Sequence, residues 1–192
     1  PPPVLAAKKQ VIKFASLAPE GTTWMRIMRK LDKDMRKATK KAVRFRIYPV
    51  GVSGNEKDVV RKLRIGQLHA AGFTGVGLGE LLPAARLFEL PFFFQSYEEV
   101  DAVHKALDPW YEAEFRKKGW VLLGWSEVGF AHFFSKNPIV ASRDLAGQKV
   151  WMWEGDPLAR AYFSAIGVRP IPLAVTDVLT SLQTGLIDTV YI

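Results

Sequence analysis

Hydrophobic and polar positions follow two different periods along the chain, and these predict strands and helices in turn. An apolar run at residues 11–17 and strict alternation of apolar residues with arginines at residues 43–48 predict two strands. Between them apolar residues recur every three or four positions, which predicts a helix that begins after Thr22 or Thr23 and buries one face. The apolar stripe of this helix comprises Trp24, Ile27, Met28, Leu31, Met35 and Ala38.

Helix-capping residues, glycines and prolines indicate where the other helices of the chain begin and end. One short helix ends at Gly66, a second helix begins at the Ser96–Glu99 capping box and is disturbed by Pro109, and a third is capped by Asp156. Further strands are expected at residues 69–74, 120–125, 130–134 and 148–153. The alternating order of strands and helices predicts an α/β fold.

An internal repeat suggests how these elements are organised. Residues 58–69 align with residues 177–188 without a gap, and an Asp, a Val, a Leu and a Gly match. The order of predicted elements before each segment also matches. We therefore expect a flexible N-terminal segment at residues 1–10 and two similar α/β lobes, at residues 11–123 and 124–192.

Two such lobes predict a ligand site. Ligands of parallel α/β sheets bind beyond the carboxyl ends of the strands, and two facing lobes form a cleft that closes by a hinge motion. The loops expected to line this cleft are residues 18–23, 49–55, 74–79, 125–131, 151–156 and 173–176.

Charge is concentrated in one segment of this 192-residue chain. Residues 26–46 hold ten lysines and arginines against two aspartates, so they account for the whole net charge of +8. This pattern is typical of a solvated helix face, and the alternative is a docking surface for an acidic partner or an anionic membrane. No nucleic-acid-binding motif accompanies the charge, so we expect no nucleic-acid partner.

Patterns that would indicate catalysis or a metal are absent from the sequence. The three histidines show no ligand spacing, there is no cysteine, and residues 124–129 are one residue too long for a GxSxG motif. The glycines at residues 72–79 match neither phosphate-binding pattern. We therefore expect no enzyme activity, no metal and no cofactor.

Several segments in order carry a family resemblance over nearly all of residues 11–192. They are Leu17-Ala18-Pro19-Glu20-Gly21-Thr22 and residues 48–54, 63–70, 89–94, 97–98, 129–130, 144–150 and 182–188. The chain resembles the solute-binding proteins of tripartite ATP-independent periplasmic (TRAP) transporters, of the dicarboxylate-binding (DctP) type. The resemblance implies a two-lobed periplasmic-binding-protein-like fold (type II-like), a periplasmic location, capture of a small solute and delivery to a membrane permease.

The resemblance also implies four site positions, and all of them are apolar in this chain. The family's carboxylate-binding arginine falls at Trp151, a second arginine at Ala131, an asparagine at Ile192 and an aromatic residue at Val175. Because a buried carboxylate needs a cationic partner, these residues predict a hydrophobic or amphipathic, lipid-like ligand. The other candidate contacts are Trp153, Phe130, Trp24, Phe73 and Trp125, with Glu20 as an acceptor for a polar head group.

Two alternatives remain open from the sequence: a receptor for an organic acid, and an interaction or scaffold module without a transport role. Family members continue past the position of Ile192, so we expect the second lobe to be incomplete. Its exposed sheet edges would then favour a homodimer or a swapped assembly.

Overall fold

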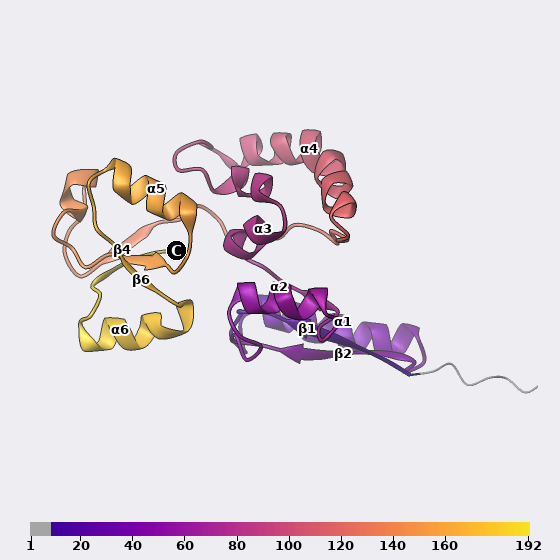
Figure 1. The fold of residues 1–192 in the computed structure, drawn as a ribbon. Helices are drawn as coiled ribbons and strands as arrows, with labels where there is room; N and C mark the ends of the chain where they lie inside the picture. Colours follow the sequence, from indigo (N-terminus) through magenta and orange to yellow (C-terminus); the bar gives the residue numbers. More distant parts are fainter. Residues whose placement is uncertain (1–8) are drawn as a thin grey trace, which may run out of the picture. The chain divides into compact units, whose positions relative to one another are not determined.

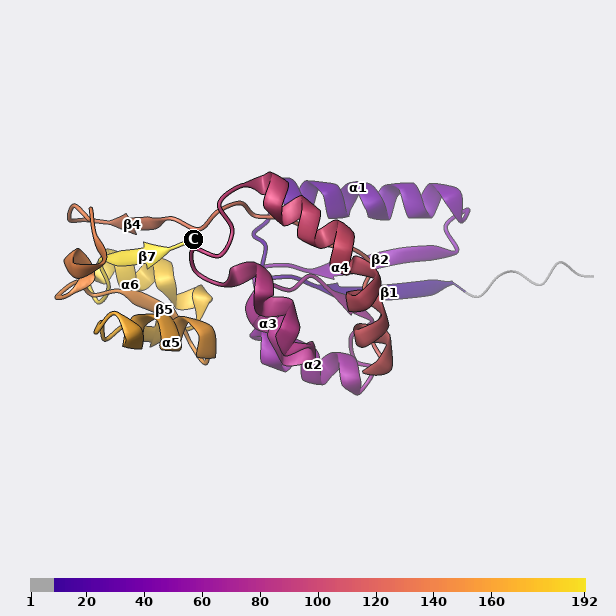
Figure 2. The same ribbon diagram turned by 90° about the horizontal axis from the view of Figure 1, so that it is seen from above.

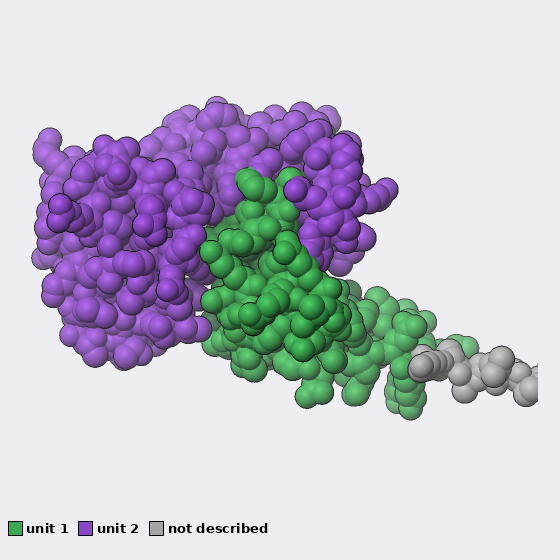
Figure 3. Space-filling model, in the orientation of Figure 1, with its two compact units in different colours: residues 1–83 green, residues 84–192 purple. Residues whose placement is uncertain are grey.

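The computed structural model describes residues 9–192, which form two compact units (Figure 3). The units divide after Pro83, earlier than the expected lobe boundary at residue 123, which stays a prediction. Most of the expected flexible segment, residues 1–8, lies outside the described residues. Gln10 was assigned to that segment wrongly, because it begins the first strand and pairs with Val43.

The first unit is a three-stranded parallel sheet in the order β2-β1-β3, with helices on both faces. Figure 2 shows α1 along one face of this sheet and α2 and α3 along the other. The elements are β1 (Gln10–Ala15), α1 (Thr23–Ala38), β2 (Val43–Tyr48), α2 (Glu56–Arg64), β3 (Ala70–Ala71) and α3 (Gly75–Leu81). Both β1 and β2 are near their predicted positions, whereas the strand predicted at residues 69–74 is reduced to two residues.

Side-chain caps begin α1 and α2, and the cap of α1 lies at one of the two predicted positions. Thr22 accepts a hydrogen bond from the backbone N–H of Met25, and Asn55 does the same for Asp58. Gly66 follows α2 with a φ of +72°, a left-handed conformation that glycine adopts readily.

The apolar stripe of α1 is less buried than predicted. Met25 is buried, but Trp24, Ile27 and Leu31 are 37%, 61% and 40% exposed. The prediction of one buried face is therefore wrong for this part of the stripe. The physical reason is that α1 packs chiefly against β2, an edge strand of a narrow sheet, which leaves the stripe uncovered within the unit.

The second unit carries two paired sets of strands, and Figure 1 shows α5 and α6 on opposite sides of them. Its elements are the 3₁₀ helix η1 (Pro83–Glu89), α4 (Tyr97–Lys117), β4 (Phe133–Ser135), the 3₁₀ helix η2 (Ser142–Leu145), β5 (Trp151–Trp153), α5 (Pro157–Ala165), β6 (Ile171–Leu173), the 3₁₀ helix η3 (Val175–Asp177), α6 (Val178–Thr184) and β7 (Thr189–Tyr191). β5 pairs with β6 in parallel, and β7 pairs with β4 in antiparallel orientation. A parallel bridge between Val150 and Thr189 joins the two pairs, so the strands follow the order β6-β5-β7-β4.

This order supports the internal repeat. In the first unit the chain runs β1-α1-β2-α2-β3 with β1 in the centre, and in the second it runs β5-α5-β6-α6-β7 with β5 between β6 and β7. Gly66 and Gly185 occupy corresponding positions of the repeat, and both have positive φ, +72° and +74°. The same winding is therefore used in both units.

Two hydrophobic cores cover the two faces of β5. Leu145, Val150, Met152 and Phe163 form one core, under α5. Trp151, Val178, Ile187 and Val190 form the other, under α6. The alternation of Trp151 and Met152 between the two cores is what a strand with both faces buried requires.

Two strands predicted between α4 and β5 differ from the structure. Residues 120–125 form no strand, and of residues 130–134 only Phe133 and Phe134 lie in one. Within residues 9–192, the backbone of residues 121–131 makes no hydrogen bond to another backbone group. A strand is defined by such a partner, so the apolar pattern alone predicted too much. In the same described range, no helix is both long and apolar enough to cross a bilayer.

Candidate functional site

Charged and aromatic side chains gather where the parallel strands of the second unit end. β5 ends at Trp153 and β7 at Tyr191, and Asp156 follows β5 at the start of α5. Arg86 and Glu89 of η1 join them there. We call Arg86, Glu89, Trp153, Asp156 and Tyr191 the carboxyl-edge cluster, and such strand ends are where α/β proteins place their ligands.

A buried ion pair forms the centre of the carboxyl-edge cluster. Arg86 donates two parallel hydrogen bonds to Asp156, from Nη1 to Oδ1 and from Nη2 to Oδ2, both 3.0 Å long. The side chains of Arg86 and Asp156 are only 13% and 5% exposed. Such bidentate pairing fixes the orientation of the guanidinium as well as its position.

Asp156 has a second structural role and Arg86 a second carboxylate neighbour. Asp156 Oδ1 accepts hydrogen bonds from the backbone N–H groups of Leu158 and Ala159, at 2.9 and 3.3 Å, and so caps α5. Arg86 Nε also forms an ion pair with Glu89 Oε2 at 2.5 Å. Burial alone would lower the pKa of Arg86, and the hydrogen bonds to Asp156 together with the charge of Glu89 raise it above its ordinary value.

Tyr191 completes the cluster on its aromatic side. Its hydroxyl accepts a hydrogen bond from the backbone N–H of Trp153 at 3.4 Å, and its ring stacks on Trp151 with a centroid distance of 5.3 Å. Burial raises the pKa of Tyr191 to about 12, so the hydroxyl is neutral at physiological pH.

Trp151, where the resemblance places an arginine, belongs to the core. It is 2% exposed, and its indole N–H donates a 3.0 Å hydrogen bond to the carbonyl oxygen of Leu173. Trp153 and Val175 pack against the same core, so the structure brings three of the predicted contact residues together. The polar atom of Trp151 is thus already satisfied within the unit.

Ile192 lies just beyond the end of the β4–β7 pair, opposite the residue that follows Ala131. His132 and Ile192 exchange two backbone hydrogen bonds of 2.7 and 3.0 Å, which extends that ladder by one pair. Both Ala131 and Ile192 are exposed. Neither supplies a polar side chain, as the sequence indicated.

Trp125 and Phe130 pack against α4 and its neighbours instead. Phe130 contacts Tyr97 at a ring-centroid distance of 4.9 Å. Trp125 lies among Phe88, His104, Tyr111 and Phe115 at centroid distances of 5.2 to 6.4 Å. Within the described chain, the Nε1 atom of Trp125 is buried and has no hydrogen-bond partner.

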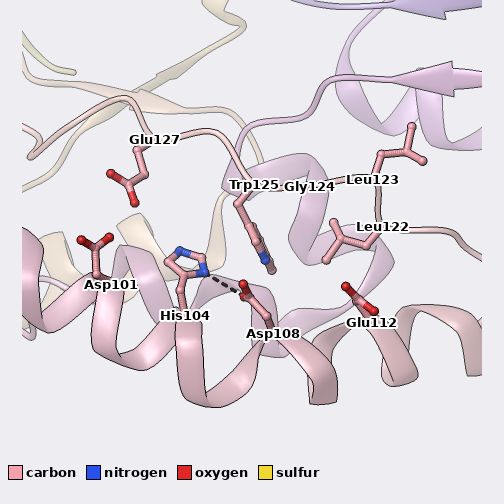
Figure 4. Close-up of a pocket in the computed structure, with 9 residues that line it drawn as sticks. All are labelled: Asp101, His104, Asp108, Glu112, Leu122, Leu123, Gly124, Trp125 and Glu127. Carbon is pink, nitrogen blue, oxygen red and sulfur yellow. Dashed lines mark hydrogen bonds and ion pairs between the residues drawn. The ribbon is translucent and has the colours of Figure 1, made fainter.

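A hollow of about 460 Å³ lies beside Trp125, between α4 and the segment that follows it (Figure 4). Its lining is acidic: it comprises Asp101, His104, Asp108, Glu112, Leu122, Leu123, Gly124, Trp125 and Glu127. His104 Nδ1 lies 3.0 Å from Asp108 Oδ1, as the dashed line in Figure 4 marks. Because four carboxylates face it, this hollow is unsuited to an organic anion.

The predicted contact residues of the first unit are divided between its surface and its core. Trp24 is exposed on α1, and Glu20 forms an ion pair with Arg29 rather than remaining free. Phe73 packs against the core formed by β1 and α2.

Glu56 is a residue of this unit that the sequence analysis missed. Its buried carboxylate accepts hydrogen bonds from the backbone N–H and the hydroxyl of Thr74, both 2.6 Å, and from the N–H of Gly77 at 2.9 Å. A Cβ at position 77 would lie 2.3 Å from Phe73 Cδ1, so glycine is needed for this close approach. The chain's own carboxylate therefore occupies the start of α3.

Arg86 was also missed, although the sequence contains a signal for it. Arg86 and Glu89 interrupt an otherwise apolar run at residues 81–94, and a charge that is buried with such a run needs a partner. The partner, Asp156, is seventy positions away, which only the fold reveals. Among residues 9–192, no group of three or more acidic or histidine side chains is placed to hold a metal ion.

Comparison with known proteins identifies the family. The family model described as bacterial extracellular solute-binding protein, family 7 (DctP), matches residues 14–190. A solute-binding protein of Roseobacter denitrificans is 27% identical over 184 residues, which cover 95% of this chain and 56% of that protein. The C4-dicarboxylate-binding periplasmic protein DctP of Rhodobacter capsulatus is 25% identical over 187 residues, which cover 95% of this chain and 55% of that protein. The chain thus spans little more than half the length of these relatives.

Solved structures confirm the predicted α/β fold of the periplasmic-binding-protein kind. A TRAP periplasmic solute-binding protein from Sulfurospirillum deleyianum, crystallised with bound succinate, has a TM-score of 0.83 and 27% identity. The match covers 96% of this chain and 60% of that one.

The predicted hydrophobic ligand is wrong in kind. The relative from Rhodobacter capsulatus is named for C4-dicarboxylates and the Sulfurospirillum deleyianum structure holds succinate, and both ligands are small organic acids. The prediction depended on Trp151 as an apolar wall of the site, whereas Trp151 is part of the core in the structure.

The family also bears on location and activity. Its members are extracellular solute-binding proteins, and the Rhodobacter capsulatus relative is named as periplasmic, which confirms the predicted location. The family consists of receptors, which confirms that the chain is not an enzyme. With a family match over residues 14–190, the chain belongs to the bacterial extracellular solute-binding proteins of family 7, the receptors of TRAP transport systems.

Proposed function

We propose that this chain captures a small organic acid for a TRAP-type system and delivers it to the permease in the membrane. The observation that carries the proposal is the likeness to the succinate-bound structure, at 27% identity over 96% of this chain. The relative named for C4-dicarboxylates supports the same ligand class. Because the chain spans only part of these proteins, ligand and permease are inferences about this chain.

A carboxylate ligand needs a cation, and Arg86 is our candidate. It lies at the carboxyl ends of β5 and β7, with only 13% of its side chain exposed. A guanidinium has five N–H donors, and Asp156 takes two of them. A further carboxylate can therefore bind without breaking the pair with Asp156.

Glu89 marks where this carboxylate would bind. Its side chain lies beside Arg86 Nε and is 40% exposed, more than either partner of the buried pair. We infer that the ligand's carboxylate takes the place of Glu89 beside Arg86. The ligand's carboxylate would there form charge-assisted hydrogen bonds to Arg86, which are stronger than those between neutral groups.

Isothermal titration calorimetry with succinate, D-glucuronate and succinamide tests the ligand class. Succinamide has the length of succinate but no charge. We expect at least one acid to bind with a Kd at least tenfold lower than that of succinamide, because a lost charge-assisted bond costs about 1.5–3 kcal/mol. Equal affinity for succinate and succinamide, or no heat with either acid, would contradict the proposal.

Two variants test the role of Arg86. Glu89→Gln removes the competing charge and should raise the affinity for the acid several-fold, whereas Arg86→Gln should lower it at least tenfold. Arg143→Gln is the matched control, because Arg143 is an exposed arginine with a side chain 88% accessible. Weaker binding by Glu89→Gln would show that Glu89 itself contacts the ligand and that the assignment is wrong.

A further inference from the structure

The surface of α1 combines exposed apolar and basic residues in a way that the binding of a solute does not explain. Trp24, Ile27 and Leu31 lie three and four positions apart, so they form one line along the helix, and all three are exposed. Asp32 of the same helix points inward, where it accepts a hydrogen bond from the N–H of Phe45. The apolar line is therefore distinct from the side of α1 that packs on the sheet.

A line of lysines runs beside the apolar line on the same helix. Lys30 pairs with Asp34 at 2.6 Å, but Lys33 and Lys37, one turn apart, form no ion pair with any residue between 9 and 192. The basic charge continues past the helix to Lys40 and Lys41, which are also exposed and lack an ion-pair partner in that range. Arg29, Lys30 and Arg36 form ion pairs, whereas the four other lysines of residues 26–46 add positive charge without such a pair in the described part of the chain.

We propose that α1 is a peripheral docking surface for an anionic lipid bilayer. Apolar residues with a tryptophan on one side and lysines beside them are the features of a helix that lies in the plane of a membrane interface. Long lysine side chains can reach lipid phosphates while their methylene stems follow the apolar line. α1 itself holds six lysines and arginines against two aspartates, and this positive charge is complementary to anionic headgroups.

The spread of the charge favours lipid over a protein partner. Headgroups are mobile and meet a diffuse field of cations, so each exposed lysine contributes without a fixed partner. A protein partner would instead place its own charges in a fixed register opposite those of α1. Lys33, Lys37, Lys40 and Lys41 are not held in this way by the described residues.

Vesicle co-sedimentation of the full chain tests the proposal. The probes are vesicles of phosphatidylcholine alone and of phosphatidylcholine mixed with phosphatidylglycerol. We expect binding to the mixed vesicles only, and we expect it to fall as salt is raised, because salt screens exposed charges. Equal binding to both vesicles, or none to the mixed ones, overturns the proposal.

Matched variants separate the charge from the apolar line. Lys33→Gln/Lys37→Gln should lower the partition coefficient about 25-fold, at about fivefold for each lysine near an anionic surface. Lys105→Gln/Arg116→Gln removes the same charge from exposed positions of α4 and should leave binding within about twofold, since these residues lie outside the surface.

The second pair of variants concerns the apolar residues. Ile27→Gln/Leu31→Gln should reduce binding at least tenfold. Leu123→Gln/Val128→Gln alters two apolar residues that are each 87% exposed elsewhere and serves as the control. Circular dichroism verifies that each variant is folded. If vesicle binding fell equally in the α1 variants and in their controls, the overall charge and exposed apolar surface of the chain, and not α1, would cause the binding.

Discussion

Removal of Arg86 from the buried pair with Asp156 should strongly destabilise the second unit. In Arg86→Met the apolar stem is kept while Asp156, 5% exposed, loses both hydrogen bonds from the guanidinium. Breaking one side of a buried pair costs about 3–5 kcal/mol. The two backbone N–H groups that also bind Asp156 place the cost at the lower end, at about 3 kcal/mol.

A double-mutant cycle measures the pair itself. Asp156→Ser keeps a side chain that can cap α5 and removes the charge. In Arg86→Met/Asp156→Ser no unpaired charge remains at these two positions. We therefore expect the double variant to lose about 2 kcal/mol less stability than the sum of the two single variants, and this difference is the coupling energy. The control Arg143→Met changes an arginine that is 88% exposed and 3.9 Å from Asp144, and it should cost less than about 0.5 kcal/mol.

Urea denaturation followed by tryptophan fluorescence provides the assay, with the free energy of unfolding extrapolated to water. Equal destabilisation by Arg86→Met and Arg143→Met would refute the reasoning. So would a coupling energy near zero, because Arg86 and Asp156 would then contribute independently.

Three further predictions concern single residues. Folding favours the neutral form of Tyr191, whose pKa is raised to about 12. Its contribution to the free energy of unfolding should therefore be complete below the ordinary pKa of about 10 and decrease as the pH rises toward 12. In Tyr191→Phe, urea denaturation at alkaline pH should no longer show this decrease in stability. The pKa of Asp32 is lowered: burial raises it, but the N–H of Phe45 and Arg36 more than compensate. The wild type should therefore be more stable than Asp32→Asn above a pH of about 4, and this difference in stability should become smaller below that pH. Acid denaturation at several pH values measures the difference. Trp151→Phe leaves the carbonyl of Leu173 without its indole donor and should cost about 1–3 kcal/mol by urea denaturation, and no loss would contradict the assignment.

Local chemistry made much of the fold predictable. The cap at Asp156, the proline at the first turn and the glycine after the last turn define α5 from neighbouring residues alone. β2 was predicted at its observed bounds because every second residue faces the same side of a sheet. The repeated order of elements was predictable because Gly66 and Gly185, which end corresponding helices, are also local signals.

The candidate site was harder to predict because it depends on distant partners. Nothing near Trp151 in the sequence shows that its N–H reaches the carbonyl of Leu173, so its place in the core was not predicted, and its role as a ligand contact stays a prediction. The pairing of Arg86 with Asp156 depends on how the chain returns after seventy residues. The predicted self-association and the cleft between two lobes stay predictions.

The position of β7 in its sheet has a consequence for how the chain matures during synthesis. β7 (Thr189–Tyr191) lies between β5 and β4, although both of those strands leave the ribosome before it. The sheet of the first unit is complete once Ala71 has been made, so that half can fold while the rest is still being translated. The sheet of the second unit cannot form completely until β7 has been made, and until then Trp151 lacks Val190 as a core partner. A ribosome-stalled nascent chain that ends before Thr189 should therefore carry one native half and one that binds chaperones.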